Sequence, residues 1–567
     1  MGEGLSLQVY LGGMLAMLAV GAVGAVGTYF ALASLKHQRS LRPTFYVLSS
    51  GAVAALAILG YTVHSWFLAG YVVVVPLVAL GLADILQRSH TIRRNFPVIG
   101  NFRYILEKIR PEIRQYFIES DSDEAPYSRQ KRSVVYQRAK DELDTIAFGT
   151  TRPVYRVGYE WITHSLAARH PSAETPRVMV GEGQCSQPYS AALLNVSAMS
   201  FGALSRTAIL ALNRGAKLGG FYHNTGEGGI SPHHVEHGGD LVWQVGTGYF
   251  GCRTSDGGFC PDRFRDRAAT PSVKMIEIKL SQGAKPGHGG ILPAAKVTPE
   301  IAEIRGVPMG RDVISPPSHT AFSTPIEMME FVGSLRELAD GKPIGLKLCV
   351  GHRREALSLF KAMLETEVYP DFITVDGAEG GTGAAPVEFS NSVGMPLVDG
   401  LLIVRNGLVG IGAKDRVRII AAGRITTGYH IVRLLALGAD FCNAARSMMF
   451  ALGCIQALKC NTNHCPVGVA TQEPGLYRAL DVGDKAQRVA RYQAATVESL
   501  MELLGAAGLS ECNDLSPWHI ARRVSATEIR NFAEIYDLVE PGSLLSEPYP
   551  EALDRSWRRA DPSTFLP

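Results

Sequence analysis

From about residue 190 onward, short apolar runs alternate with longer stretches that have the periodicity of amphipathic helices. Short apolar runs of this kind are typical of strands buried in a parallel sheet. Eight strands are predicted, at 195–200, 221–224, 241–245, 275–280, 344–350, 372–376, 417–422 and 441–445. Most are separated by helix-length segments, which predicts an α/β chain with a (β/α)8 or TIM barrel. A doubly wound sheet is the alternative, but no G-x-G-x-x-G opens the first unit.

Two apolar stretches precede this pattern and predict transmembrane helices. Residues 5–35 carry no charged side chain and lack the basic start of a signal peptide. Residues 45–83 are about twice as long as one span requires and are interrupted only by His64. We therefore expect about three helices within 1–87, the last two forming a hairpin that turns near 61–65.

Basic residues flank these stretches and indicate their orientation. Lys36, Arg39 and Arg42 follow the first stretch, and a second basic segment begins at Arg88. With three spans both segments lie on one side, which the positive-inside rule makes cytoplasmic. The sequence thus predicts a multi-pass protein of the cytoplasmic (inner) membrane, with its catalytic domain in the cytoplasm.

The remaining chain divides by composition into three further parts. A basic juxtamembrane helical region is expected at 88–175, the barrel at 176–510, and a C-terminal tail packed on the barrel at 511–567. The formal net charge of +3 is too small to favour a nucleic-acid partner. A homo-oligomer is compatible with this organisation.

Three cysteines lie close together near the end of the barrel region, as Cys454-x5-Cys460-x4-Cys465-Pro466. This spacing suits thiolates that hold one iron–sulfur cluster, and the other six cysteines are scattered. Three ligands suggest a [3Fe–4S] cluster, or a [4Fe–4S] cluster with a distant or non-cysteine fourth ligand. The alternative is a group of partly buried structural thiols. A cluster requires a reducing compartment, in agreement with a cytoplasmic barrel.

Glycine-rich turns follow the predicted strands where the active site of such a barrel is formed. Glycines let backbone amides approach a phosphate closely. The candidate cofactor-binding residues of these turns are Asp376, Gly380, Gly381, Thr382 and Gly383 after strand six, and Gly423, Arg424 and Gly428 after strand seven. Lys279 and Lys347 end strands four and five, where a cation can stabilise a reduced cofactor ring. The alternative is that the glycines only form tight turns and the lysines reach solvent.

These blocks, in this order, closely resemble the FMN-binding synthase domain of glutamate synthase over residues 197–472. The resemblance implies an FMN across the barrel mouth and a [3Fe–4S] cluster beside it, held by Cys454, Cys460 and Cys465. It also implies that FMN faces the two glycine-rich loops and Met199, Ser200, Gln244, Lys279 and Lys347. Glu227 and Lys285 correspond to residues near the substrate, so the implied catalytic set is Lys347, Lys279, Glu227 and Lys285. In that family the reduced flavin reduces 2-iminoglutarate, which forms from 2-oxoglutarate and ammonia.

The chain departs from the family pattern at three positions, and at one of them His288 stands where the family has an acidic residue. Tyr249 stands where the family has an arginine that helps bind the dicarboxylate, and Ile291 where it has glutamine. Loss of the arginine removes a charge-assisted contact, for which nearby Arg253 is a candidate replacement. The substrate therefore need not be 2-oxoglutarate. Neither a dinucleotide fingerprint nor a glutaminase-sized segment is visible, so glutamine- and NADPH-dependent glutamate formation is not expected from this chain alone.

Three functions follow from these observations. The leading hypothesis is an FMN and iron–sulfur oxidoreductase that aminates a 2-oxo acid reductively through an imine. Its partners would be a small amino or 2-oxo acid, the membrane, and an electron donor or acceptor such as ferredoxin or quinone. A second hypothesis is an amino-acid or amine dehydrogenase that passes electrons to a membrane acceptor. The non-enzymatic alternative is a membrane electron-carrier or scaffold subunit, against which the retained Glu227 and Lys285 argue.

Overall fold

The computed structural model describes residues 40–120, 123, 126–170 and 174–565, together with isolated positions between 14 and 29. The chain forms two compact units, which meet in the sequence between Glu119 and Ser120. The two units are described separately below.

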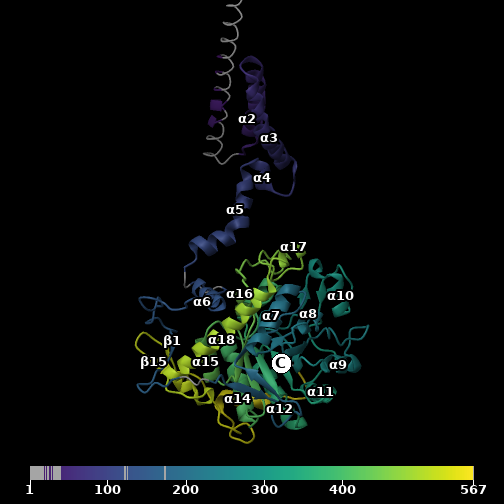
Figure 1. Cartoon of the computed structure of the whole chain (residues 1–567), viewed down its shortest axis with the longest axis vertical. Helices are drawn as coiled ribbons and strands as arrows, with labels where there is room; N and C mark the ends of the chain where they lie inside the picture. The colour runs from purple at the N-terminus through teal and green to yellow at the C-terminus, as the bar shows by residue number, and fades with distance from the viewer. Residues whose placement is uncertain are drawn as a thin grey trace, which may run out of the picture. The chain divides into compact units, whose positions relative to one another are not determined.

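The first unit contains a hairpin of two apolar helices (Figure 1). Helix α2 (Arg42–Thr62) is followed by the 3-10 helix η1 (Ser65–Gly70) and by α3 (Tyr71–Leu86). The hydroxyl of Tyr71 donates to the Val53 carbonyl at 2.8 Å, and Gly81 lies directly against the ring of Phe45. The break between the helices lies within the predicted turn at 61–65.

Residues Arg42–Thr62 and Ser65–Leu86 are long and apolar enough to cross a membrane, by length and composition only. Most of the first expected span, 5–35, lies outside the described residues. Beyond the hairpin, the first unit continues with α4 (Thr91–Asn95), α5 (Gly100–Ile113) and the π-helical turn η2 (Arg114–Ile118).

The second unit is built on a closed barrel of eight parallel strands, which confirms the predicted fold class. In chain order the strands are β4 (Leu194–Val196), β5 (His223–Asn224), β6 (Leu241–Val245), β7 (Val273–Lys279), β10 (Ile344–Leu348), β11 (Phe372–Asp376), β12 (Arg418–Ala422) and β13 (Phe441–Ala444). Each overlaps one of the eight predicted segments, although β4 and β7 begin one and two residues before theirs. The strands are buried on both faces, which explains their continuous apolar runs.

Helices follow most of the strands and cover the barrel (Figure 1). They are α7 (Arg206–Gly219), α9 (Pro261–Ala268), α11 (Pro325–Leu338), α12 (Arg353–Thr366), α14 (Leu397–Gly410), α15 (Gly428–Ala436) and α18 (Val482–Ala506). Helix α7 shows why these segments are helical: the Ser205 hydroxyl caps its start, and Gly220 ends it in the left-handed conformation. Only the one-turn helix α8 (Pro232–Val235) connects β5 to β6.

A long excursion connects β7 to β10 and contributes to the barrel mouth. It contains the antiparallel pair β8 (Ile291–Leu292) and β9 (Val313–Ile314), the 3-10 helix η3 (Ala294–Lys296), and α10 (Pro299–Arg305). Smaller elements elsewhere in this unit are the antiparallel pair β2 (Arg177–Val180) and β3 (Tyr189–Ala192), α13 (Val387–Ser392), α16 (Arg446–Ala451) and α17 (Pro474–Tyr477).

Segments from both sides of the barrel sequence pack on its outside. Helix α6 (Arg129–Lys140) packs against α16 and α18. Strand β1 (Glu160–Ile162) forms an antiparallel sheet with β14 (Ile520–Arg523) and β15 (Ile529–Asn531). The rest of the tail forms the 3-10 helices η4 (Cys512–Asp514) and η5 (Pro517–His519), α19 (Phe532–Ile535) and α20 (Glu551–Arg559). Lys361 on α12 donates to the Ala560 carbonyl at 2.8 Å, which fixes the end of the tail to the barrel.

Candidate active site

A cavity of about 320 Å³ lies at the carboxyl ends of the barrel strands. Of the predicted site residues, it is lined by Met199, Ser200, Glu227, Gln244, Lys279, Lys285, Lys347, Gly381, Thr382, Gly383, Cys454, Cys460 and Cys465. The strand ends and the cysteine segment, far apart in the sequence, thus border one space. Among the described lining residues, Glu227 is the single carboxylate, against seven cations: Lys279, Lys285, Lys296, Arg305, Lys347, Arg446 and Lys459. Such a cavity suits an anionic ligand.

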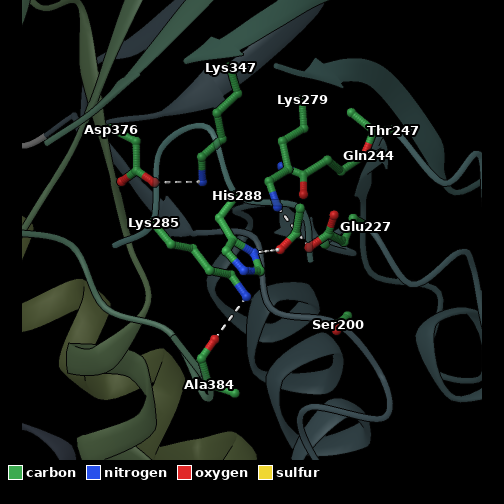
Figure 2. Close-up of polar contacts among 12 residues, drawn as sticks. Ser200, Glu227, Gln244, Thr247, Lys279, Lys285, His288, Lys347, Asp376 and Ala384 are labelled. Atoms are coloured by element: carbon green, nitrogen blue, oxygen red, sulfur yellow. Dashed lines mark hydrogen bonds and ion pairs between the residues drawn. The ribbon is translucent and has the colours of Figure 1, made fainter. Parts of the chain in front are cut away.

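Two lysines at the ends of neighbouring strands form the floor of the site (Figure 2). Lys279 on β7 and Lys347 on β10 are register partners and point into the same space. Adjacent like charges would repel each other, but each lysine has its own carboxylate. Lys279 Nζ lies 2.7 Å from Glu227 Oε1, and Lys347 Nζ lies 3.4 Å from Asp376 Oδ2. Asp376 therefore supports Lys347 and stands outside the cavity lining.

Electrostatics keep Lys347 charged although it is buried. Burial alone would lower the pKa of Lys347, but the carboxylates of Asp376, Glu277 and Glu227 outweigh burial and raise it. Glu277 lies in the barrel interior and accepts hydrogen bonds from the side chains of Asn224, Gln244 and Thr374. The Gln244 amide is thus fixed toward Glu277.

Glu227 is ionised in this environment. Burial would raise the pKa of its carboxyl, but Lys279, Arg305 and Lys285 outweigh that effect and lower it. Lys285 lies on the loop after β7, and its Nζ donates to the Ala384 carbonyl at 2.8 Å (Figure 2). Burial lowers the pKa of Lys285 to about 8, with Glu227 acting to raise it and Lys279 to lower it further. A lysine with this pKa can exchange protons near neutral pH.

Arg305 is a site residue that the sequence reasoning missed. It ends α10, in the excursion after β7, and only 4% of it is exposed. Its guanidinium donates to the Ser200 hydroxyl and the Phe201 carbonyl and lies 5.2 Å from the centre of the Phe250 ring. The Nε atom is buried without a hydrogen-bond partner among the described residues. Burial lowers the pKa of Arg305 to about 10, so the residue remains a cation at neutral pH.

The glycine-rich loops meet at two arginines. The Glu379 carbonyl, just before Gly380, accepts from Arg424 Nε at 3.2 Å and from an Arg446 guanidinium nitrogen at 2.7 Å. A Cβ on Gly381 would lie only 2.7 Å from Arg446 Nε, so glycine lets this cation reach the cavity. Arg446 lines the cavity, and the sequence reasoning did not identify it.

Other glycines of these loops have packing roles. A Cβ on Gly428 would lie 2.5 Å from the Leu500 amide nitrogen, so this glycine lets α15 approach α18. Gly380, Gly423, Arg424 and Gly428 lie outside the cavity lining. Their assignment as cofactor-binding residues stays a prediction.

The cysteine segment forms one wall of the same cavity. The Tyr136 hydroxyl of α6 donates to the Cys454 carbonyl at 2.6 Å, and the Gln456 amide lies 3.5 Å from the Cys454 sulfur. Gln456 and Leu458 have positive φ angles of 57° and 55°, so the backbone between the cysteines is strained. In the described part of the chain, no three His, Cys, Asp or Glu side chains are grouped closely enough to hold a metal ion. Cluster binding therefore belongs to the proposals below.

A buried lysine lies beside these cysteines. Lys296 of η3 is 2% exposed and donates to the carbonyls of Ala203 and Ala470 at 3.1 and 2.8 Å. Burial lowers the pKa of Lys296 to about 8, and the nearby Cys460 and Cys465 act to raise it. Burial also raises the pKa of Cys454 to about 12, so this thiol is protonated without a bound metal. Any metal would have to displace that proton.

Tyr249 does not occupy a substrate position, contrary to the expectation from the sequence. Its side chain is fully buried and absent from the cavity lining. The hydroxyl lies 3.0 Å from His319 Nδ1 and accepts from the amides of Thr320 and Ala321, both at 3.1 Å. Its φ of 47° lies in the left-handed region. Tyr249 is therefore a loop anchor, and an arginine at this position would not face a bound dicarboxylate. Ile291 does line the cavity.

Comparisons with known proteins agree with this architecture. A family model described as a conserved region in glutamate synthase matches residues 169–510. The glutamate synthase large subunit-like protein YerD of Bacillus subtilis (strain 168) is 38% identical over 504 residues, which cover 81% of this chain and 95% of that protein. The archaeal glutamate synthase (NADPH) of Methanocaldococcus jannaschii is 35% identical over 321 residues. These cover 56% of this chain, and the chain spans only 60% of that relative.

Among solved structures, mandelate oxidase with (S)-2-phenylpropionate gives a TM-score of 0.38 at 14% identity, covering 76% of this chain and 97% of that one. The family match covers more than half of the chain, and YerD matches over nearly its whole length. Both findings confirm the resemblance drawn from the strand-end motifs. The chain belongs to the glutamate synthase family of oxidoreductases.

Proposed function

We propose that this protein is an FMN and iron–sulfur oxidoreductase that forms an amino acid by reductive amination of a 2-oxo acid. The observation that carries the proposal is the single cavity that combines seven cations, one carboxylate and three cysteines. Relatives named glutamate synthase support the same reaction class. An electron-carrier or scaffold subunit would not need the buried pairs of Lys279 and Glu227 or Lys347 and Asp376.

The residues present fit FMN, and one wall of the cavity carries the three thiols that a cluster would have to draw together. Arg446, which reaches the cavity past Gly381, suits the phosphate of FMN. The two lysines of the floor suit its ring. Cys454, Cys460 and Cys465 supply thiols on the adjoining wall, and Lys296 offers positive charge beside them. Bound FMN would supply the hydride, and a cluster would supply electrons one at a time.

The chain's own residues would bind and protonate the substrate. Arg305 is buried, charged and held by Ser200 and Phe201, so it can bind the carboxylate of a 2-oxo acid. Lys279 and Lys347 would stabilise negative charge at the barrel floor. Lys285 would give a proton to the imine nitrogen and recover it near neutral pH.

The proposal can be tested on protein purified in detergent without oxygen. We expect one FMN on acid extraction, bound iron, and amino-acid formation from ammonium and a 2-oxo acid with reduced methyl viologen as donor. Cys460→Ser should lose most of its iron, because two thiols cannot hold the cluster. Cys512→Ser is a matched control, because Cys512 is also half-buried but lies outside the cavity. Retention of iron by Cys460→Ser, or equal loss in both variants, would contradict the cluster assignment.

The pH dependence should identify the proton donor. If protonated Lys285 is required, kcat/KM should fall above a pH of about 8. Glu227 raises the pKa of Lys285, so in Glu227→Gln the alkaline limb of the pH profile, where kcat/KM falls, should move to lower pH. The pKa of Lys296 is also about 8, but Glu227 does not contribute to it. A limb that stays in place in Glu227→Gln would therefore point to Lys296 and refute the role of Lys285.

The apolar hairpin supports a location in the cytoplasmic membrane, with the barrel unit in the cytoplasm. Helix α2 with 21 residues, and η1 with α3 together with 22, have the length of single spans. The turn at 63–64 would face the opposite side from Arg42 and Arg88. A reporter fused near residue 64 should therefore be non-cytoplasmic, and a cytoplasmic signal there would refute the hairpin insertion.

The same hairpin favours a second candidate function, an amino-acid or amine dehydrogenase that reduces a membrane acceptor. The two functions differ in the direction of electron flow. Amino acids added without oxygen to the oxidised protein would reduce the flavin, and a soluble quinone added afterwards would reoxidise it, only in the second case. Bleaching of the flavin spectrum by amino acids, without turnover of 2-oxo acids, would replace the leading proposal.

A further inference from the structure

The residues between α3 and the start of α5 form a tight corner, which directs helix α5 away from the end of the hairpin. The Asp84 carboxylate, on α3, accepts from the Val98 amide at 2.9 Å and from Asn101 Nδ2 at 2.6 Å. Val98 has a φ of 66°, which is rare for a β-branched residue and marks a tight, specified turn. A Cβ on Gly100 would lie 2.9 Å from the Arg93 Cα, so α5 starts in close contact with α4.

The start of α2 is attached to the same corner. The Leu41 amide donates to the Asn95 carbonyl at 2.8 Å, and Arg42 Nε donates to the Arg94 carbonyl at 2.7 Å. The hairpin thus begins and ends where α4 and α5 lie. This is the end of the hairpin at which the charged residues of the unit are concentrated.

One face of α5 packs on this corner, and its opposite face is apolar and exposed. Asn101 bonds Asp84, and the ring of Tyr104 lies 4.5 Å from the guanidinium carbon of Arg93. The other face carries large apolar residues spaced three and four apart: Ile99, Phe102, Ile105, Leu106 and Ile109, each at least 41% exposed. The turn η2 extends this face with Phe117 and Ile118.

A stripe of arginines borders the apolar face. Arg103, Arg110 and Arg114 are separated by seven and four residues, so they lie on one side of the helix next to Ile99 and Leu106. Residues 88–118 contain seven Lys or Arg against two Glu. Long arginine side chains at such a border can extend toward charged headgroups while their stems stay apolar.

We propose that α5 and η2 lie flat on an anionic lipid surface, with the apolar face in the headgroup boundary and the arginine stripe on lipid phosphates. This inference rests on insertion of the hairpin. The 14 residues of α5 are too few, and too highly charged, to cross a bilayer. An amphipathic helix with a basic border is typical of the interface. Its position at the basic end of the hairpin would place it at headgroup level.

The test uses the full chain in nanodiscs of phosphatidylcholine alone or with phosphatidylglycerol. Amide exchange of residues 99–118 is followed by mass spectrometry, with peptides of α18 as internal control. We expect exchange at least tenfold slower in the anionic discs than in the neutral discs or in detergent. Each arginine near an anionic surface contributes about fivefold to partitioning. In 1 M salt the difference between the lipids should vanish, because the Debye length falls to about 3 Å.

Variants separate charge from general packing. Replacing Arg103, Arg110 and Arg114 together by glutamine should abolish the difference between the lipids. The matched variant with lysine at these three positions keeps the positive charge and should retain most of the difference in exchange between the two lipids. Equal protection in detergent and both lipids would show that protein, the barrel or a second copy, covers the face, and would overturn the proposal. The absence of protection in detergent and in both kinds of nanodisc would also overturn the proposal. Failure of the chain to enter nanodiscs would instead overturn the hairpin insertion.

Discussion

Lys347→Met should lower the rate of amino-acid formation by at least about a hundredfold, with little loss of bound iron. Removing one preorganised charge-stabilising donor typically costs about 10²–10³ in rate. Lys347 is buried at the barrel floor and kept charged by Asp376, Glu277 and Glu227. Methionine has a similar length and packs in its place, but cannot stabilise negative charge. Turnover with reduced methyl viologen and iron analysis of the same sample measure both effects.

The stability of the protein must be separated from its chemistry. Loss of Lys347 removes the ion-pair partner of the half-buried Asp376, which then keeps the Gly283 amide as a hydrogen-bond donor, so the variant should lose folding free energy. The double variant Lys347→Met/Asp376→Asn removes both charges, so it should recover stability but not activity.

Lys342→Met is a second control, because Lys342 is also buried, precedes the same strand and lies outside the cavity. Its Nζ donates to the Ala268 carbonyl, so the variant should lose stability and retain its rate once folded. If Lys347→Met keeps a rate within threefold of the unaltered protein, the lysine has only a structural role.

The barrel could be predicted because the apolar runs of the individual strands and the overall topology of the barrel agree with each other. Strands such as Leu241–Val245 and Ile344–Leu348 are buried on both faces, so each appears as a continuous apolar run. Their carboxyl ends meet at one rim by topology, so the sequence alone predicts that Lys279, Lys347 and Gly381 lie together, as they do.

The rest of the site depends on tertiary contacts that leave no periodic signal. Arg305 lies on a short helix 26 positions after Lys279, and only the path of the excursion after β7 brings it to the cavity. Tyr249 stands where the family has a substrate-binding arginine, but its side chain is fully buried and its hydroxyl is bonded to the Thr320 and Ala321 amides. The resemblance to the family located this residue in the chain, but it did not give the direction of the side chain.

Arg305→Met should raise the KM for a 2-oxo acid and lower kcat/KM by roughly 10- to 150-fold, equivalent to about 1.5–3 kcal/mol for a charge-assisted contact. Arg305 is the cation of α10 in the lining, and its Nε has no partner among the described protein atoms. Arg305→Lys keeps the charge but loses the planar fork, so its loss should be intermediate.

Arg253→Met is the matched control for this change. Both arginines lie over the ring of Phe250, at 5.2 Å for Arg305 and 5.5 Å for Arg253, but only Arg305 lines the cavity. From the sequence, Arg253 was the candidate to replace the arginine lost at position 249. The structure predicts instead that Arg253→Met leaves KM within about twofold, because its guanidinium lies outside the cavity. A large rise in KM for Arg253→Met, with none for Arg305→Met, would reverse the assignment.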